Sequence, residues 1–186
     1  MTKVHKFTAF LRSLGLVVAV IGAGCNEKAN HGQSGGVHLE PSSVRLIPNK
    51  GINEVGFGDE RQVVKKKMGK PSFEHGPLLS YTNIGVDVWL SKKNDKVIRI
   101  TAGSFESIQE AQRFQGHISS LKIGSTCEDV ITKLGQPDVV DQQKNIDSSA
   151  SDEVFIYFKL GMQVNFREKQ AILFTLENSG RVPNKK

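Results

Sequence analysis

Cys127 is the residue of this sequence best placed for nucleophilic chemistry. It lies in the first turn of a predicted helix, where the helix dipole can lower the pKa of a thiol. No histidine is arranged to assist it, because His31 and His38 fall in a polar N-terminal segment and His75 and His117 are isolated. The sequence also has no Cys/His spacing for a metal, no glycine-rich phosphate loop and no nucleophile elbow. We therefore expect no catalytic residues, no metal and no cofactor.

A second kind of chemistry, recognition of another molecule, is indicated by two stretches of alternating sequence. Residues 81–90 alternate between apolar and polar side chains, and residues 157–166 repeat the pattern. This alternation predicts antiparallel strands with one face on a core and one toward solvent. Interface hot spots are enriched in Trp, Tyr and Arg. The residues that we expect to bind a protein through the solvent face are Tyr81, Asp87, Trp89, Arg99, Tyr157, Gln163 and Asn165. The alternative for Trp89 is that its ring only shields the sheet.

The element that must position these strands occurs twice, as residues 58–71 and 124–137. Both copies carry a glycine, a valine, a closing Met or Leu, a second glycine and a proline at the same spacing. Asp59 and Ser125 each precede a Gln or Glu by three residues, which is capping-box spacing and predicts the start of a helix. The second glycine fits the left-handed position after the last turn, and the proline ends the helix.

The repeat extends into the strands that follow each helix. We therefore predict an α+β fold of two tandem repeats, each a helix plus an antiparallel sheet, with the helices packed on one sheet face. Repeat 1 covers residues 44–103 and repeat 2 covers residues 117–186, with a connector at 104–116. Each repeat alone would be marginally stable, so we expect the two to pack together. In the second repeat the polar stretch 141–153 predicts a surface loop.

The N-terminal part of the chain has the features of a targeting segment. Residues 1–24 combine basic residues, a short apolar run and small residues before Cys25. The run is shorter than the ~20 residues that a membrane-spanning helix needs, so the pattern predicts a signal peptide. Its end resembles a bacterial lipobox, which makes Cys25 the expected lipidation site; the alternative is an ordinary secretory peptide with an incidental cysteine. Residues 25–43 predict a lipidated cysteine followed by a flexible tether, and Asn26 favours the outer membrane.

The charge of the chain excludes one class of partner. The formal net charge is +6, with 25 basic and 19 acidic residues. Removing Lys3, Lys6 and Arg12 with the signal peptide leaves 25 − 3 = 22 basic residues against 19 acidic ones. The densest basic run, residues 65–67, fits the solvated end of a helix, where cations suit the dipole; the alternative is a patch that binds lipid headgroups or nucleic acid. We expect no nucleic-acid partner.

The helix motif followed by antiparallel strands, carried most fully by residues 121–137 and 157–166, is similar to a known family. It resembles the SmpA/OmlA (BamE-type) small lipoproteins of outer-membrane assembly, and the unit in tandem resembles beta-lactamase inhibitory protein. The resemblance implies an α+β fold with helices on one sheet face, and binding rather than catalysis.

These observations together predict a cell-envelope lipoprotein that binds an unidentified envelope protein through its sheet face. The N-terminal lipid would hold it on the periplasmic face of the outer membrane, where it would act as an inhibitor or an assembly scaffold. The alternative function is binding of a small ligand or envelope polymer in the cleft between the repeats. A passive envelope spacer is a third interpretation.

Overall fold

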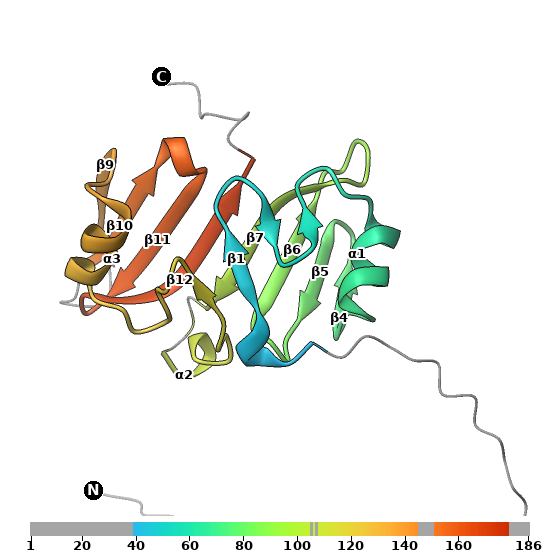
Figure 1. The fold of residues 1–186 in the computed structure, drawn as a ribbon, viewed down its shortest axis with the longest axis horizontal. Coiled ribbons are helices and arrows are strands. Elements are labelled where there is room, and N and C mark those ends of the chain that lie inside the picture. Colours follow the sequence, from blue (N-terminus) through green and yellow to red (C-terminus); the bar gives the residue numbers. More distant parts are fainter. Residues whose placement is uncertain (1–38, 105, 107, 145–150, 179–186) are drawn as a thin grey trace, which may run out of the picture. The chain divides into compact units, whose positions relative to one another are not determined.

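The computed structural model describes residues 39–104, 106, 108–144 and 151–178 (Figure 1). The predicted signal peptide, Cys25 and the first part of the predicted tether lie outside the described residues. Pro41–Ser43 forms a 3-10 turn, η1, and Leu39 packs against the core. The folded part therefore begins before residue 44, inside the segment that we assigned to the tether.

The largest element is an eight-stranded antiparallel sheet with the order β4-β5-β6-β7-β12-β11-β10-β9. Each half is a meander of strands that follow one another in the chain, and the halves join where β7 pairs with β12. The strands are β4 (Phe73–His75), β5 (Leu78–Tyr81), β6 (Val86–Leu90), β7 (Val97–Gly103), β9 (Val139–Lys144), β10 (Ser151–Tyr157), β11 (Met162–Arg167) and β12 (Gln170–Glu177).

A second layer lies on one face of this sheet, with α1 and α3 on either side of a small four-stranded sheet (Figure 1). The small sheet has the order β3-β2-β1-β8, and β1 pairs with β8 in parallel. The fold therefore belongs to the α+β class, as predicted. The remaining elements are β1 (Arg45–Ile47), β2 (Gly51–Ile52), β3 (Val55–Gly56), α1 (Arg61–Met68), α2 (Ile108–Ala111), β8 (His117–Ile118), α3 (Cys127–Leu134) and the 3-10 turn η2 (Phe158–Leu160).

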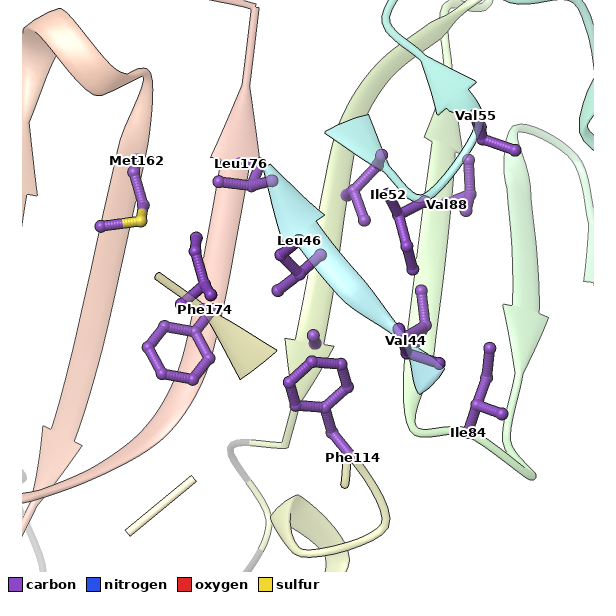
Figure 2. Close-up of a cluster of buried hydrophobic side chains, with 14 of the residues drawn as sticks. Val44, Leu46, Ile52, Val55, Ile84, Val88, Phe114, Met162, Phe174 and Leu176 are labelled. Atoms are coloured by element: carbon purple, nitrogen blue, oxygen red, sulfur yellow. The ribbon is translucent and has the colours of Figure 1, made fainter. Parts of the chain in front are cut away.

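Apolar side chains between the two layers form the core. Figure 2 shows Leu46 and Ile52 of the small sheet beside Val88 of β6 and Phe174 and Leu176 of β12. Each of these side chains is at most 1% exposed, and full burial of such a side chain contributes roughly 1.5–3 kcal/mol. Because β6 and β12 belong to different halves of the large sheet, the small sheet ties the two halves together.

Both α1 and α3 end at a glycine with an unusual backbone. Gly69 has φ 83° and ψ −168°, and Gly135 has φ 85° and ψ −173°. Positive φ at these positions is what the sequence predicts. The ψ values place both residues in a region that is essentially restricted to glycine, rather than in the left-handed helical region. Each glycine amide still donates to a carbonyl of the last helical turn.

The two helices begin differently from our prediction. The capping box of α3 lies one residue later, and it joins Thr126 to Asp129 through bonds of 3.0 and 3.1 Å. Asp59 does not cap α1, because its carboxylate accepts hydrogen bonds from the Gly56 amide and the Lys67 ammonium. Asp59 therefore ties the last turn of α1 to the β2–β3 segment.

The prediction of a surface loop over residues 141–153 is wrong at 141–144 and 151–153, which belong to strands, and its middle, residues 145–150, lies outside the described residues. β9 and β10 pair from Val139 with Ile156 to Lys144 with Ser151. Polar side chains do not prevent this pairing, since the ladder is built from backbone hydrogen bonds. The second half of the sheet thus gains a long hairpin at its edge.

Candidate binding face

Within the described residues, α1, α3 and the small sheet cover one face of the large sheet, and we call the opposite face the open face. The strand register arranges its side chains in rows across neighbouring strands. The first row contains Leu78, Trp89, Arg99 and Glu177. The second row contains Ser80, Asp87, Thr101, Thr175, Gln163 and Ile156. The third row contains Gly103, Leu173, Asn165, Val154 and Asp141.

A hollow in the middle of the open face brings together four of the predicted binding residues. Asp87, Trp89, Arg99 and Gln163 line it, and its volume is about 460 Å³. It lies over β6, β7, β12 and β11, where the two halves of the sheet join. We call it the central hollow. Its other lining residues are Thr101, Gly103, Ser104, Glu106, Leu173, Thr175 and Glu177.

The charges of the central hollow are unevenly paired. Arg99 Nε donates to Glu177 Oε1 at 2.6 Å, and the Arg99 side chain is half exposed. No ion pair or hydrogen bond within the described residues engages the carboxylates of Asp87 and Glu106. The half-buried ring of Trp89 likewise makes no aromatic or cation–π contact there. Trp89 therefore presents its ring to the hollow beside an unpaired carboxylate.

Tyr81 and Tyr157 are not on the open face, which corrects the prediction for both residues. They are 2% and 3% exposed and belong to the core. The cause is a turn after each tyrosine: Tyr81 pairs with Val86, and Tyr157 pairs with Met162, across the strands that follow. Residues that pair directly across an antiparallel ladder point to the same face, so each tyrosine shares the buried face of its partner.

The two buried tyrosines instead fasten the helix ends. Tyr81 Oη donates to the Gly69 carbonyl at 3.3 Å, and Tyr157 Oη donates to the Gly135 carbonyl at 3.1 Å. Burial, with a smaller effect from Glu74, raises the pKa of Tyr81 to about 12. Burial also raises the pKa of Tyr157. Both hydroxyls therefore stay protonated and keep donating over the whole neutral range.

Asn165 lies on the open face as predicted but is only 8% exposed. It stands between Val154 of β10 and Leu173 of β12, which are themselves buried. Its Oδ1 has no hydrogen-bond partner among the described residues. The expectation of an exposed contact residue is therefore wrong for Asn165, which is buried with Val154 and Leu173 on this face.

Sequence reasoning missed the residues that β12 contributes to the central hollow. Leu173 is 3% exposed and Thr175 is 6% exposed, and Glu177 completes the set. Residues 171–174 of β12 are all apolar, and this run hides the two faces of the strand. The available signal was the alternation of Thr175 and Glu177 with the core residues around them. Glu106 carried no such signal, because it lies in the connector.

Cys127 does not have the electrostatics of a reactive thiol. Its Sγ lies 3.7 Å from Glu153 Oε2 and 3.8 Å from the Lys169 carbonyl. Burial, reinforced by the negative charge of Glu153, raises its pKa above the ordinary value. This is opposite to the lowering that its place in the first turn of α3 would favour, so the thiol is protonated at neutral pH.

A second hollow, with a volume of about 580 Å³, lies on the other side of the molecule between α1 and the β2–β3 segment. Its lining is mainly apolar, with Leu39, Val55 and Met68, and Lys66 and Lys67 at its rim. It is larger than the central hollow but contains none of the predicted binding residues.

The described residues contain neither a metal-binding cluster nor a membrane-spanning helix. No group of three or more His, Cys, Asp and Glu side chains in this part of the chain is placed to hold a metal ion. No helix between residues 39 and 178, in the described ranges, is long and apolar enough to cross a membrane.

The chain resembles known proteins in structure, and the level of similarity is low. No family model and no curated protein sequence matches the chain. A DUF4309 family protein from Bacillus subtilis is 15% identical, with a TM-score of 0.38, over 64% of this chain and 78% of that one. An extracellular protein containing an SCP domain, from Bacillus anthracis, is 11% identical, with a TM-score of 0.39, over 67% of this chain and 45% of that one. At these scores neither likeness bears on function.

Proposed function

We propose that this protein is a binding module that holds a protein of the cell envelope against the open face of its large sheet. The observation that carries the proposal is the central hollow, where Trp89, Arg99 and Asp87 meet on the sheet face opposite the second layer. Hot spots cluster near the centre of an interface and are enriched in Trp and Arg. Binding rather than catalysis is also favoured by the raised pKa of Cys127.

The tandem-repeat arrangement is part of the proposal, and matched geometry supports it. In each half a tyrosine that ends a strand donates to the carbonyl of the glycine that ends a helix: Tyr81 to Gly69, and Tyr157 to Gly135. The strand order is also mirrored, since β4 to β7 run forward and β12 to β9 run backward across the sheet. Two copies of one unit would thus place two similar sheets side by side, as the resemblance to beta-lactamase inhibitory protein implies.

We propose further that a lipid on Cys25 anchors the protein to the outer membrane, facing the periplasm. The order of basic, apolar and small residues before Cys25 supports the lipid, and Asn26 supports the outer membrane. The resemblance of the helix motif to BamE-type lipoproteins agrees with this location. The polar segment that follows Cys25 would act as the tether.

A pull-down from detergent-solubilised envelope membranes tests the proposed function. The wild-type chain should retain one protein in stoichiometric amount, and Trp89→Ala should lose it. Glu128→Gln, a change at an exposed residue of α3 on the opposite side of the sheet, is the matched control and should retain the protein. Equal retention by wild type and Trp89→Ala would overturn the proposal.

Binding of a small ligand or an envelope polymer is the second candidate function. The observation in its favour is that the central hollow sits at the junction of the two halves and has the volume of a small-molecule site, about 460 Å³. A retained polysaccharide or small molecule in the same pull-down, without a stoichiometric protein, would favour this second function.

A further inference from the structure

The central hollow is acidic although the chain as a whole is basic. Asp87, Glu106 and Glu177 contribute three carboxylates to its lining, and Arg99 contributes one guanidinium. The balance is 1 − 3 = −2 at neutral pH, against a formal net charge of +6 for the whole sequence. The local field therefore favours a cation in the hollow and opposes an anion.

The four charges differ in how they are satisfied. Arg99 and Glu177 neutralise each other through their contact of 2.6 Å. Asp87 and Glu106 have no ion pair or side-chain hydrogen bond in the described part of the chain, so the excess negative charge resides on these two carboxylates. Asp87 lies two residues before Trp89 on β6, and residues at this spacing share a face of a strand. An unpaired carboxylate and an indole ring thus stand next to each other.

We propose that the central hollow binds the guanidinium group of an arginine side chain presented by the partner, an inference that rests on the proposed protein-binding function. The flat guanidinium would stack on the ring of Trp89, because an aromatic face attracts a cation. The carboxylate of Asp87 would accept its N–H groups in a bidentate pair, for which arginine is better suited than lysine.

The rest of the lining suits the same side chain. Thr101, Thr175 and Gln163 stand in one row with Asp87 across the sheet and offer oxygen acceptors for the remaining N–H donors. These oxygens and the carboxylate of Asp87 would together accept hydrogen bonds from the guanidinium.

The single tryptophan of the chain makes the inference measurable, because Trp89 fluorescence reports on this hollow alone. The full chain in detergent micelles is titrated with N-acetyl-arginine amide and, in parallel, with N-acetyl-citrulline amide, which has nearly the same shape and no charge. We expect a saturable change with the arginine compound. The citrulline compound should bind about tenfold more weakly or worse, since it loses a charge-assisted hydrogen bond.

Two variants separate a local effect from general electrostatics. Asp87→Asn should weaken binding of the arginine compound by about tenfold or more, because it removes the unpaired carboxylate beside Trp89. Glu128→Gln removes the same charge from an exposed position on α3 and should leave the affinity unchanged. Equal urea midpoints for Asp87→Asn and wild type would establish that the altered affinity does not come from unfolding.

The outcomes distinguish this inference from the proposed function. No saturable response to the arginine compound, or equal responses to both compounds, would overturn the inference. A response only to an envelope glycan oligomer would also overturn it and favour the second candidate function. Loss of the partner by Trp89→Ala without arginine binding would leave the proposed function standing and the inference refuted. Arginine binding with full partner retention by Trp89→Ala would refute the proposed function and, with it, the inference that the partner supplies the arginine.

Discussion

Replacing Gly135 by valine isolates the energetic cost of the backbone conformation that ends α3. Gly135 has φ 85° and ψ −173°, in the region that is essentially restricted to glycine. A Cβ atom added there would meet no other atom within 4 Å. The space for a Cβ is open, so the expected cost is the strain of the backbone, about 1–3 kcal/mol. If the chain relieves the strain by rotating the peptide, the Tyr157 hydrogen bond of 3.1 Å to the Gly135 carbonyl is lost instead.

The matched control is Thr132→Val in the same helix. Thr132 is exposed, and threonine and valine are both β-branched with similar helix propensities, so this change should be close to neutral. The expected difference in unfolding free energy between the two variants is ~1–2 kcal/mol, with Gly135→Val the less stable.

Urea unfolding followed by far-ultraviolet circular dichroism measures this difference. The two variants should have the same m-value and different midpoints, because the change acts on stability and not on the surface exposed by unfolding. A Gly135→Ala variant, which lacks the β-branch, should lie close to Gly135→Val if φ sets the cost. Equal midpoints for Gly135→Val and Thr132→Val would refute the assignment of a strained glycine cap.

Three further predictions concern a hydrogen bond, an ion pair and the lipid on Cys25. Tyr157→Phe removes the bond to the Gly135 carbonyl and should lower the unfolding free energy by about 0.5–1.5 kcal/mol in the same urea assay. Arg61 hydrogen-bonds Asp95 at 2.6 and 2.8 Å and thereby lowers the pKa of that carboxyl below its ordinary value of 3.8. The stabilisation that this ion pair gives is present above the ordinary pKa of the carboxyl and is lost as the pH falls through the lowered pKa of Asp95. The stability deficit of Arg61→Leu against wild type should therefore be constant above about pH 5 and shrink on further acidification, and a deficit that does not change with pH would contradict the pairing. Cys25→Ser should abolish labelling by a radioactive fatty acid and release the protein from the membrane fraction, whereas an unlabelled wild type would exclude the lipid.

The parts of the fold that were predictable from sequence are those fixed by local chemistry. The glycine and proline that end each helix determine where α1 and α3 stop, whatever packs around them. The period of two along β6 places Asp87 and Trp89 on the face opposite Val88, and the structure brings both into the central hollow. These features depend on residues within one turn or one strand.

The parts that were not predictable depend on contacts between distant segments. β1 and β8 are very short, and they become strands through pairing: β1 pairs with β2, and with β8 through Arg45 to His117 and Leu46 to Ile118. Tyr81 looks like a continuation of the β6 alternation, and only the turn before Val86 reverses its face. The apolar and polar alternation along a single strand carries no information about such a turn.

The edge strand β9 was not predicted from the sequence for a related reason. The polar residues at 141–144 are typical of a loop, yet as an edge strand β9 needs only backbone hydrogen bonds on one side. Glu177 was likewise missed, because its role depends on the Arg99 side chain of a strand far away in sequence.

The central claim is that the open face binds a partner through Trp89, and comparing Trp89→Ala with Val88→Ala tests it most directly. Val88 is 0% exposed and points into the core, so Val88→Ala leaves a cavity and should cost more stability than Trp89→Ala. Thermal unfolding and affinity for the protein retained from envelope membranes are measured for both variants. The account predicts that Trp89→Ala loses ~2 kcal/mol or more of binding while unfolding close to wild type. Wild-type affinity of Trp89→Ala, or unfolding as early as that of Val88→Ala, would contradict it.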